Sequence, residues 1–190
     1  MEQAQQRPAL VLLTRADAGS QTERPGVRLK NMPVIELQTE IAAPKERVFD
    51  LARSIDVHQD TAEQTGERAV AGTTSGLIGA GEEVTWEARH FGIKLRLQVK
   101  MTKFDRPNHF QDIMISGAFR SMQHDHIFED HGGNTVMVDR FEYISPLGLL
   151  GRIADLLFLE RYMRSFIQKR NASLKRTAES MDWKQYLKTA

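Results

Sequence analysis

Histidine and aspartate residues in the middle of the sequence have the types and spacing needed for proton transfer. His124 and His126 lie two residues apart in an alternating segment, so both imidazoles point to the same face of a predicted strand. Asp112 and Asp139 lie among apolar and aromatic residues of two other alternating segments. Burial and close partners shift the pKa values of such groups toward those required for general acid or base catalysis. The four residues are candidate catalytic residues, and no catalytic set is assigned.

Two further roles are compatible with these side chains. A hydrogen-bonded network that fixes strand register is the favoured one, because buried polar groups are normally paired. A metal site is the least favoured, because the ligand spacing of cupins is missing, and we expect neither a metal nor a cofactor. Three further histidines fall in predicted loops or at strand ends, where we expect solvated side chains: His58, His109 and His131.

Apolar and aromatic residues share strand faces with these polar groups. If the faces line one cavity, it combines imidazoles and carboxylates with apolar surface, as ligand pockets do. The candidate ligand-binding residues are Trp86, His90, Phe110, Asp112, Met114, Met122, His124, His126, Phe128, Phe141 and Tyr143.

Alternation with a period of two predicts the strands that position these residues. The first covers residues 34–41, and it is followed by two short helices over 44–52 and 56–64. Short turns containing Gly, Pro and Asn separate the later strands, which indicates an antiparallel meander. These later strands are predicted over 83–90, 93–102, 109–116, 121–129 and 134–144.

The period changes to 3.6 after residue 148 and predicts one long amphipathic helix that ends near Glu179. We predict an α+β fold in which a curved antiparallel sheet of six or seven strands surrounds this helix and leaves a cavity. The outer face of the helix is basic and is expected to be solvated, with transient contact to anionic lipid headgroups as the alternative. Its basic residues are Arg161, Arg164, Lys169, Arg170, Lys175 and Arg176.

Composition excludes several classes of protein. The 190 residues include 26 Lys and Arg against 25 Asp and Glu, a balance that argues against nucleic acid as a partner. The absence of cysteine excludes disulfides, Cys-ligated zinc and thiol nucleophiles. No apolar run approaches the length of a membrane span, so no integral membrane segment is expected. We expect a monomer or a homodimer.

The chain divides into three parts. Residues 1–32 are polar and rich in turn formers, which predicts a flexible N-terminal extension. Residues 33–179 form the predicted ligand-binding domain, and 180–190 a C-terminal tail. The apolar patch at residues 10–13 is too short for a secretory signal and is followed by Arg15 and Asp17, so a cytoplasmic location is expected.

The order of elements and several short segments resemble a known superfamily. The residues are Val48-Phe49-Asp50-Leu51 in the first helix, Tyr143-Ile144-Ser145-Pro146-Leu147-Gly148 before the last one, and Gly81 to Ala88, Phe110-Gln111-Asp112 and His124-Asp125-His126 in the strands. Together they resemble the helix-grip superfamily of START domains, birch-pollen-allergen-like proteins and polyketide cyclases, and in particular small bacterial SRPBCC proteins.

The resemblance implies a cavity between sheet and helix, and three functions remain open. The first is binding, and possible transport, of a hydrophobic small molecule such as a lipid or polyketide. The second is a cyclase, dehydratase or hydrolase without a cofactor, in which cavity His and Asp residues act as acid and base. The third is a non-catalytic interaction protein linked to stress response or cell division, which a cavity below about 300 Å³ would favour.

Overall fold

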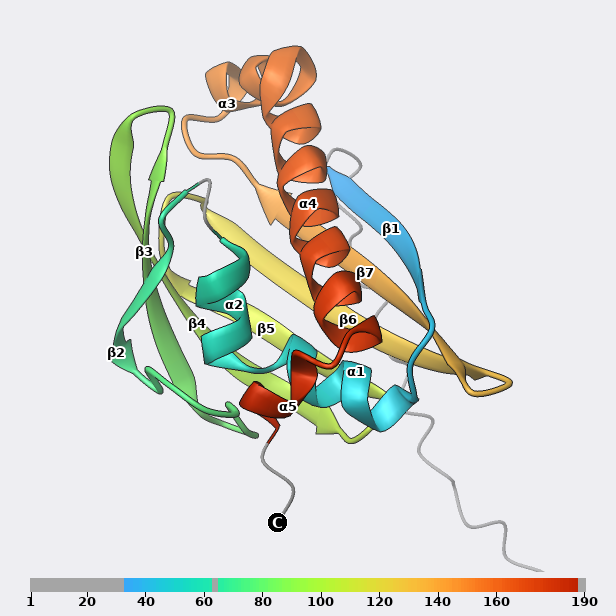
Figure 1. The fold of residues 1–190 in the computed structure, drawn as a ribbon. Coiled ribbons are helices and arrows are strands. Elements are labelled where there is room, and N and C mark those ends of the chain that lie inside the picture. The colour runs from blue at the N-terminus through green and yellow to red at the C-terminus, as the bar shows by residue number, and fades with distance from the viewer. Residues whose placement is uncertain (1–32, 63–64, 188–190) are drawn as a thin grey trace, which may run out of the picture. The chain divides into compact units, whose positions relative to one another are not determined.

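A seven-stranded antiparallel sheet frames the molecule (Figure 1). The computed structural model describes residues 33–62 and 65–187. The sheet order is β1-β7-β6-β5-β4-β3-β2, so the first and last strands pair and the rest form the predicted meander. The strands are β1 (Val34–Ile41), β2 (Arg68–Gly72), β3 (Glu83–His90), β4 (Ile93–Asp105), β5 (His109–Ser116), β6 (Ser121–His131) and β7 (Asn134–Ile144).

The turn between β6 and β7 shows how sequence sets register. Gly132 and Gly133 both have positive φ, at 67° and 92°, which glycine adopts without steric strain. They join His131 to Asn134, which are paired across the two strands. This tight hairpin places His126 directly opposite Asp139.

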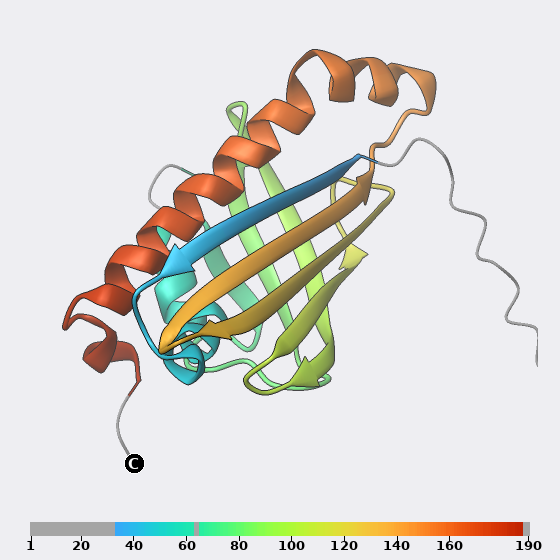
Figure 2. The same ribbon diagram turned by 90° about the vertical axis from the view of Figure 1, so that its right-hand side faces the viewer.

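Three helical segments cover the concave face of the sheet. The two short helices that follow β1 are α1 (Lys45–Ala52) and α2 (Ile55–Thr61), and α2 ends three residues before the predicted limit. The long helix α4 (Glu160–Glu179) runs alongside β1, as Figure 2 shows. Phe49 of α1 packs edge-on against Phe110 and Phe128, with ring centroids 5.4 and 5.3 Å apart. This aromatic cluster belongs to the core beneath α1.

The predicted long C-terminal helix is confirmed, and it contains a π-helical turn that the prediction did not include. Helix α3 (Leu149–Ala154) leads into a π-helical turn, η1 (Asp155–Leu159), before α4 begins. Asp155 is buried in this turn and accepts a hydrogen bond from the Ser145 hydroxyl. The spacing of apolar residues cannot predict this π turn, because the turn involves a single polar residue bonded to the preceding loop. Such π turns are local insertions into α-helices.

The chain continues past Glu179 into helix α5 (Trp183–Tyr186). The Arg47 guanidinium lies 4.3 Å from the centre of the Trp183 ring, and the Tyr186 hydroxyl donates to Asp60. Residues up to 187 of the predicted tail therefore pack against α1 and α2. The predicted extension, residues 1–32, and residues 188–190 lie outside the described part.

We expect Gly72→Ala to destabilise the protein by about 2 to 3 kcal/mol, as measured by urea unfolding. Gly72 has φ +75°, and an added Cβ would lie 2.1 Å from the Glu83 carbonyl oxygen of the neighbouring strand. The matched control is Gly76→Ala, at φ +74° with nothing within 4 Å of the added Cβ, which should cost about 1 kcal/mol. Equal losses in the two variants would contradict a steric contribution from β3.

Candidate functional site

A cavity of about 270 Å³ lies between the concave side of the sheet and α4. Apolar and aromatic side chains form most of its wall, with a small number of polar groups among them. Leu97 and Val99 of β4 and Met163 and Ile167 of α4 contribute to the apolar part. The exposed residues of the lining, Phe91, Arg96, Ala118 and Pro146, mark where the cavity opens to solvent.

The structure brings three of the four candidate catalytic residues into one buried cluster. Asp139 on β7 is fully buried, and its Oδ1 accepts a hydrogen bond from His124 Nε2 at 2.9 Å. His126 Nδ1 lies 3.0 Å from the same oxygen, as an ion pair without well-directed hydrogen-bond geometry. The two imidazole rings are tilted over each other with centroids 3.9 Å apart. The fourth residue, Asp112, lies 3.6 Å from His126 Nε2, so His126 is placed between two carboxylates.

Helix α4 completes this cluster from the opposite side. Asn171 donates to Asp139 Oδ2 at 2.6 Å, and a guanidinium nitrogen of Arg170 lies 3.5 Å from Oδ1. The prediction that Arg170 belongs to a solvated outer face is therefore wrong. Arg170 lies in the lining of the cavity, since the helix turns this position toward the sheet.

The charges of the cluster follow from burial and contacts. Burial favours a neutral Asp139, but hydrogen bonds and charges from His124 and His126 outweigh it and hold its pKa well below the ordinary value. Burial and the neighbouring His126 lower the pKa of His124 to about 4. Burial also opposes the charge on His126, yet Asp112 and Asp139 raise its pKa. At neutral pH the cluster therefore holds a neutral His124 and an ionised Asp139, and the two carboxylates favour the protonated form of His126.

Metal binding is disfavoured by the same geometry. His124, His126 and Asp139 offer ligand atoms within 4.8 Å of one another. A divalent cation on Asp139 Oδ1 would lie beside the Arg170 guanidinium, one nitrogen of which is 3.5 Å from that oxygen, and like charges so close together repel in a buried site.

Six of the eleven candidate ligand-binding residues line the cavity: Trp86, His90, Asp112, Met122, His124 and Phe141. The other five, Phe110, Met114, His126, Phe128 and Tyr143, lie outside the lining within the described part of the chain. Phe110 and Phe128 pack against Phe49 in the core. Strand alternation identifies which residues face inward. It does not show which part of the concave face is covered by α1 and which part borders the cavity.

Helix α4 adds lining residues that are not among the candidates predicted from the sequence. Tyr162, Phe166 and Arg170 follow one another at intervals of four along α4, and this spacing was the signal that could have found them. The Tyr162 hydroxyl lies 2.7 Å from His90 Nδ1. Burial lowers the pKa of His90, against the effect of the nearby Glu67 carboxylate.

His58 was expected to be solvated, and this expectation is wrong. It lies on α2, stacks on Trp86 with ring centroids 4.1 Å apart, and lies in the cavity lining. Its Nε2 is 3.0 Å from a carboxylate oxygen of the buried Glu67. His109 is also paired, since its Nε2 lies 2.8 Å from Asp125 Oδ1, whereas His131 is exposed.

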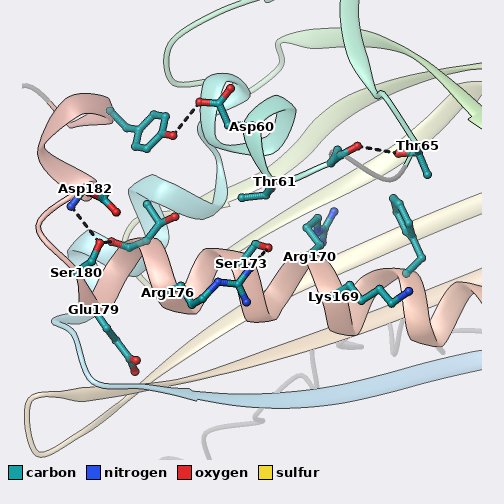
Figure 3. A pocket seen from close by; sticks show the side chains of 14 residues that line it. Asp60, Thr61, Thr65, Lys169, Arg170, Ser173, Arg176, Glu179, Ser180 and Asp182 are labelled. Atoms are coloured by element: carbon teal, nitrogen blue, oxygen red, sulfur yellow. Dashed lines mark hydrogen bonds between the residues drawn. The ribbon is translucent and has the colours of Figure 1, made fainter.

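A larger groove of about 760 Å³ lies on the other side of Arg170, between α2 and the last turns of α4 (Figure 3). Its wall is polar and carries both signs of charge, with Lys169 and Arg176 opposed by Asp60, Glu179 and Asp182. Tyr186 donates to Asp60 at 2.8 Å, and Arg176 donates to Ser173 at 2.7 Å. This mixture of charges makes the groove unsuitable for an apolar ligand.

Comparisons with solved structures show the same fold. TTHA0849 from Thermus thermophilus is 20% identical, with a TM-score of 0.64 over 77% of this chain and 97% of that chain. Zhui aromatase/cyclase from Streptomyces sp. R1128 is 13% identical, with a TM-score of 0.59 over 77% and 95%. A START superfamily protein from Mycobacterium smegmatis is 10% identical, with a TM-score of 0.60 over 77% and 97%.

These neighbours share the predicted fold, and the arrangement of a curved sheet around a long helix is the helix-grip fold. No curated protein matches the sequence. The family model described as polyketide cyclase / dehydrase and lipid transport matches residues 32–179, from just before β1 to the last residue of α4. With most of its length covered by that match, the chain belongs to the polyketide cyclase / dehydrase and lipid transport family.

Proposed function

We propose that the protein binds a small apolar molecule in the cavity between the sheet and α4. The observation that carries the proposal is an apolar enclosure with a few polar groups on its wall, which is the usual construction of a ligand site. Burial of the ligand against Trp86, Met122 and Phe141 supplies affinity. Asp112, His124 and Arg170 orient a polar group of the ligand.

The volume limits the size of this ligand. About 270 Å³ is slightly below the usual range of ligand pockets, which begins near 300 Å³. A molecule with one or two rings, or a short acyl chain, fits this space, and a longer lipid has to extend through the opening beside Phe91 and Pro146. The small volume also favours the interaction hypothesis, so the first experiment must separate the two. Solvent extraction of the purified protein followed by mass spectrometry should find an apolar molecule, and an empty extract favours the interaction protein.

We expect Ala88→Leu to weaken binding of an apolar fluorescent probe by about tenfold or more. Ala88 is buried on β3 and lines the cavity, so the larger side chain occupies ligand space. The measurement is a probe titration together with a thermal melt, and the melting temperature should stay near that of the wild type. Ala172→Leu, at an exposed position of α4, is the matched control and should bind the probe normally. Undiminished binding by Ala88→Leu would place the probe elsewhere.

Acid and base catalysis is the second candidate, favoured by the His124–Asp139 pair. The single N–H of a neutral His124 is donated to Asp139 through Nε2, which leaves Nδ1 as a proton acceptor. Asp139 therefore selects the tautomer and orients the ring, as carboxylates do beside catalytic histidines. A pKa of about 4 makes His124 a weak base at neutral pH, and for this reason binding ranks above catalysis.

A further inference from the structure

The upper end of the helical layer exposes an unusual amount of apolar surface. We define the apical patch as Leu149, Leu150, Ile153, Leu156, Leu157 and Phe158, on α3 and η1. Leu156 is 85% exposed, and Leu147, just before the patch, is 77% exposed. Single exposed leucines are common, but contiguous large apolar side chains mark an interaction surface. Figure 2 shows α3 beyond the end of the strands, away from the concave face that α4 covers.

In α3 and η1 the apolar residues face solvent and the small and polar residues face the protein, which is the reverse of an ordinary amphipathic helix. The buried residues of this segment are Gly151 and Asp155, four positions apart on the face turned toward the protein. A Cβ on Gly151 would lie 2.0 Å from the Pro146 carbonyl oxygen, so only glycine permits this approach. Asp155 is tied to Ser145. Small and polar residues thus attach the segment to the protein, and its leucines face outward.

The charges beside the patch indicate what covers it. Arg152 lies within the segment and Arg161 follows it by half a turn, and both are exposed. The two acidic residues of the same stretch are occupied, since Asp155 is buried and Glu160 lies 3.8 Å from Arg164. Leucine and phenylalanine combined with arginine suit a surface of anionic lipid. A second copy of the chain would bring like charges together, which opposes self-association through this face.

We propose that α3 and η1 dock on an anionic lipid surface. The segment lies in the headgroup region and does not cross the bilayer, since none of the described helices is long and apolar enough to span one. Phe91, which lines the cavity opening, has its ring centroid 5.6 Å from that of Phe158 in the patch. Docking therefore brings the opening of the cavity to the membrane. Exchange of a ligand there rests on the proposed function, whereas docking does not.

Vesicle flotation of the full chain tests this proposal. We expect binding to vesicles of phosphatidylcholine with phosphatidylglycerol, weaker binding at high salt, and little binding to phosphatidylcholine alone. The double variant Leu156→Ser/Leu157→Ser should lose about tenfold or more in vesicle affinity, since two exposed leucines no longer enter the lipid. Arg152→Glu should reduce binding to the anionic vesicles only. Met181→Ser, exposed at the opposite end of α4, is the control and should bind as the wild type does.

Several outcomes overturn docking: no binding to anionic vesicles, equal losses in the Met181 control, or a wild-type oligomer that the double serine variant dissociates. The last result would assign the patch to a second copy of the chain. All variants change exposed side chains, so matching thermal melts show that the fold is intact. Vesicle binding by a chain with an empty cavity contradicts only the proposed function. Ligand binding without vesicle binding contradicts only docking.

Discussion

Asp139→Ala is expected to lower the free energy of unfolding by about 3 to 5 kcal/mol. The side chain is fully buried and offsets the charge of Arg170 at 3.5 Å and that of the protonated form of His126 at 3.0 Å. Alanine leaves Arg170 and the protonated form of His126 without this counter-charge and leaves His124 Nε2 without its acceptor. Breaking a buried pair from one side is far more costly than the pair is worth, because the remaining charge stays desolvated. Urea unfolding at pH 7 measures the loss.

Two comparisons make this result specific. Glu142→Ala removes a carboxylate from the same strand, 2.7 Å from Arg140 and partly exposed, and should cost no more than about 1 kcal/mol. Asp139→Asn keeps an acceptor for His124 but loses the charge, so its stability should fall between those of the wild type and Asp139→Ala. A loss below about 1 kcal/mol for Asp139→Ala would show that the cluster is not held by its ionised carboxylate.

Acidification from pH 6.5 to about 4 is expected to remove on the order of 3 kcal/mol of stability through His124 alone. The pKa of His124 is about 4 in the folded protein and 6.5 when unperturbed. Between these values the unfolded chain binds a proton that the folded chain does not, so stability falls as pH falls. His90, whose pKa is also lowered, adds to this loss. Asp139 adds its own loss below its ordinary pKa, because its folded pKa is depressed.

His126 has the opposite dependence. Its raised pKa contributes stability that is complete below pH 6.5 and is lost as pH rises through the folded value. Well below pH 6.5 it is therefore protonated in both states and leaves the slope there to His124. Urea unfolding at pH 6.5 and 4.5 should show a smaller difference for His124→Gln than for the wild type. His131→Gln, at an exposed hairpin position, should keep the wild-type difference, and equal slopes in all three proteins would contradict a depressed His124 pKa.

Much of the fold is predictable because strands and their turns are local signals. The alternation at 93–102 predicts a strand, and the observed strand begins at the same residue and ends three residues later, at Asp105. The hairpin at Gly132 and Gly133 is likewise local, since positive φ is a property of single residues. The π-helical turn at Asp155 was not predictable from apolar periodicity, since Asp155 is held by a hydrogen bond to Ser145 in the loop before α3.

The candidate site also has a part that the sequence predicts and a part that only the tertiary structure shows. The spacing of His124 and His126 is enough to place them on one strand face, and Asp139 is their partner because the neighbouring strand brings it opposite His126. The predictions for Arg170 and His58 are wrong, because the pattern within a single helix does not show which of its residues face the sheet. Whether a helical residue faces solvent depends on how the helix is rotated against the sheet, and that rotation is set by packing.

From its sequence alone, this protein was determined to be a curved meander closed by a C-terminal helix, with histidine and carboxylate on an inward face. Periodicity and turn chemistry suffice for that, because each acts over a few residues. Only the tertiary structure decided which inward residues line a cavity and which are core, because α1 fills the region around Phe110 and Phe128. It also decided the charges of the cluster, because burial and contacts between β6, β7 and α4 set the pKa values of His124, His126 and Asp139.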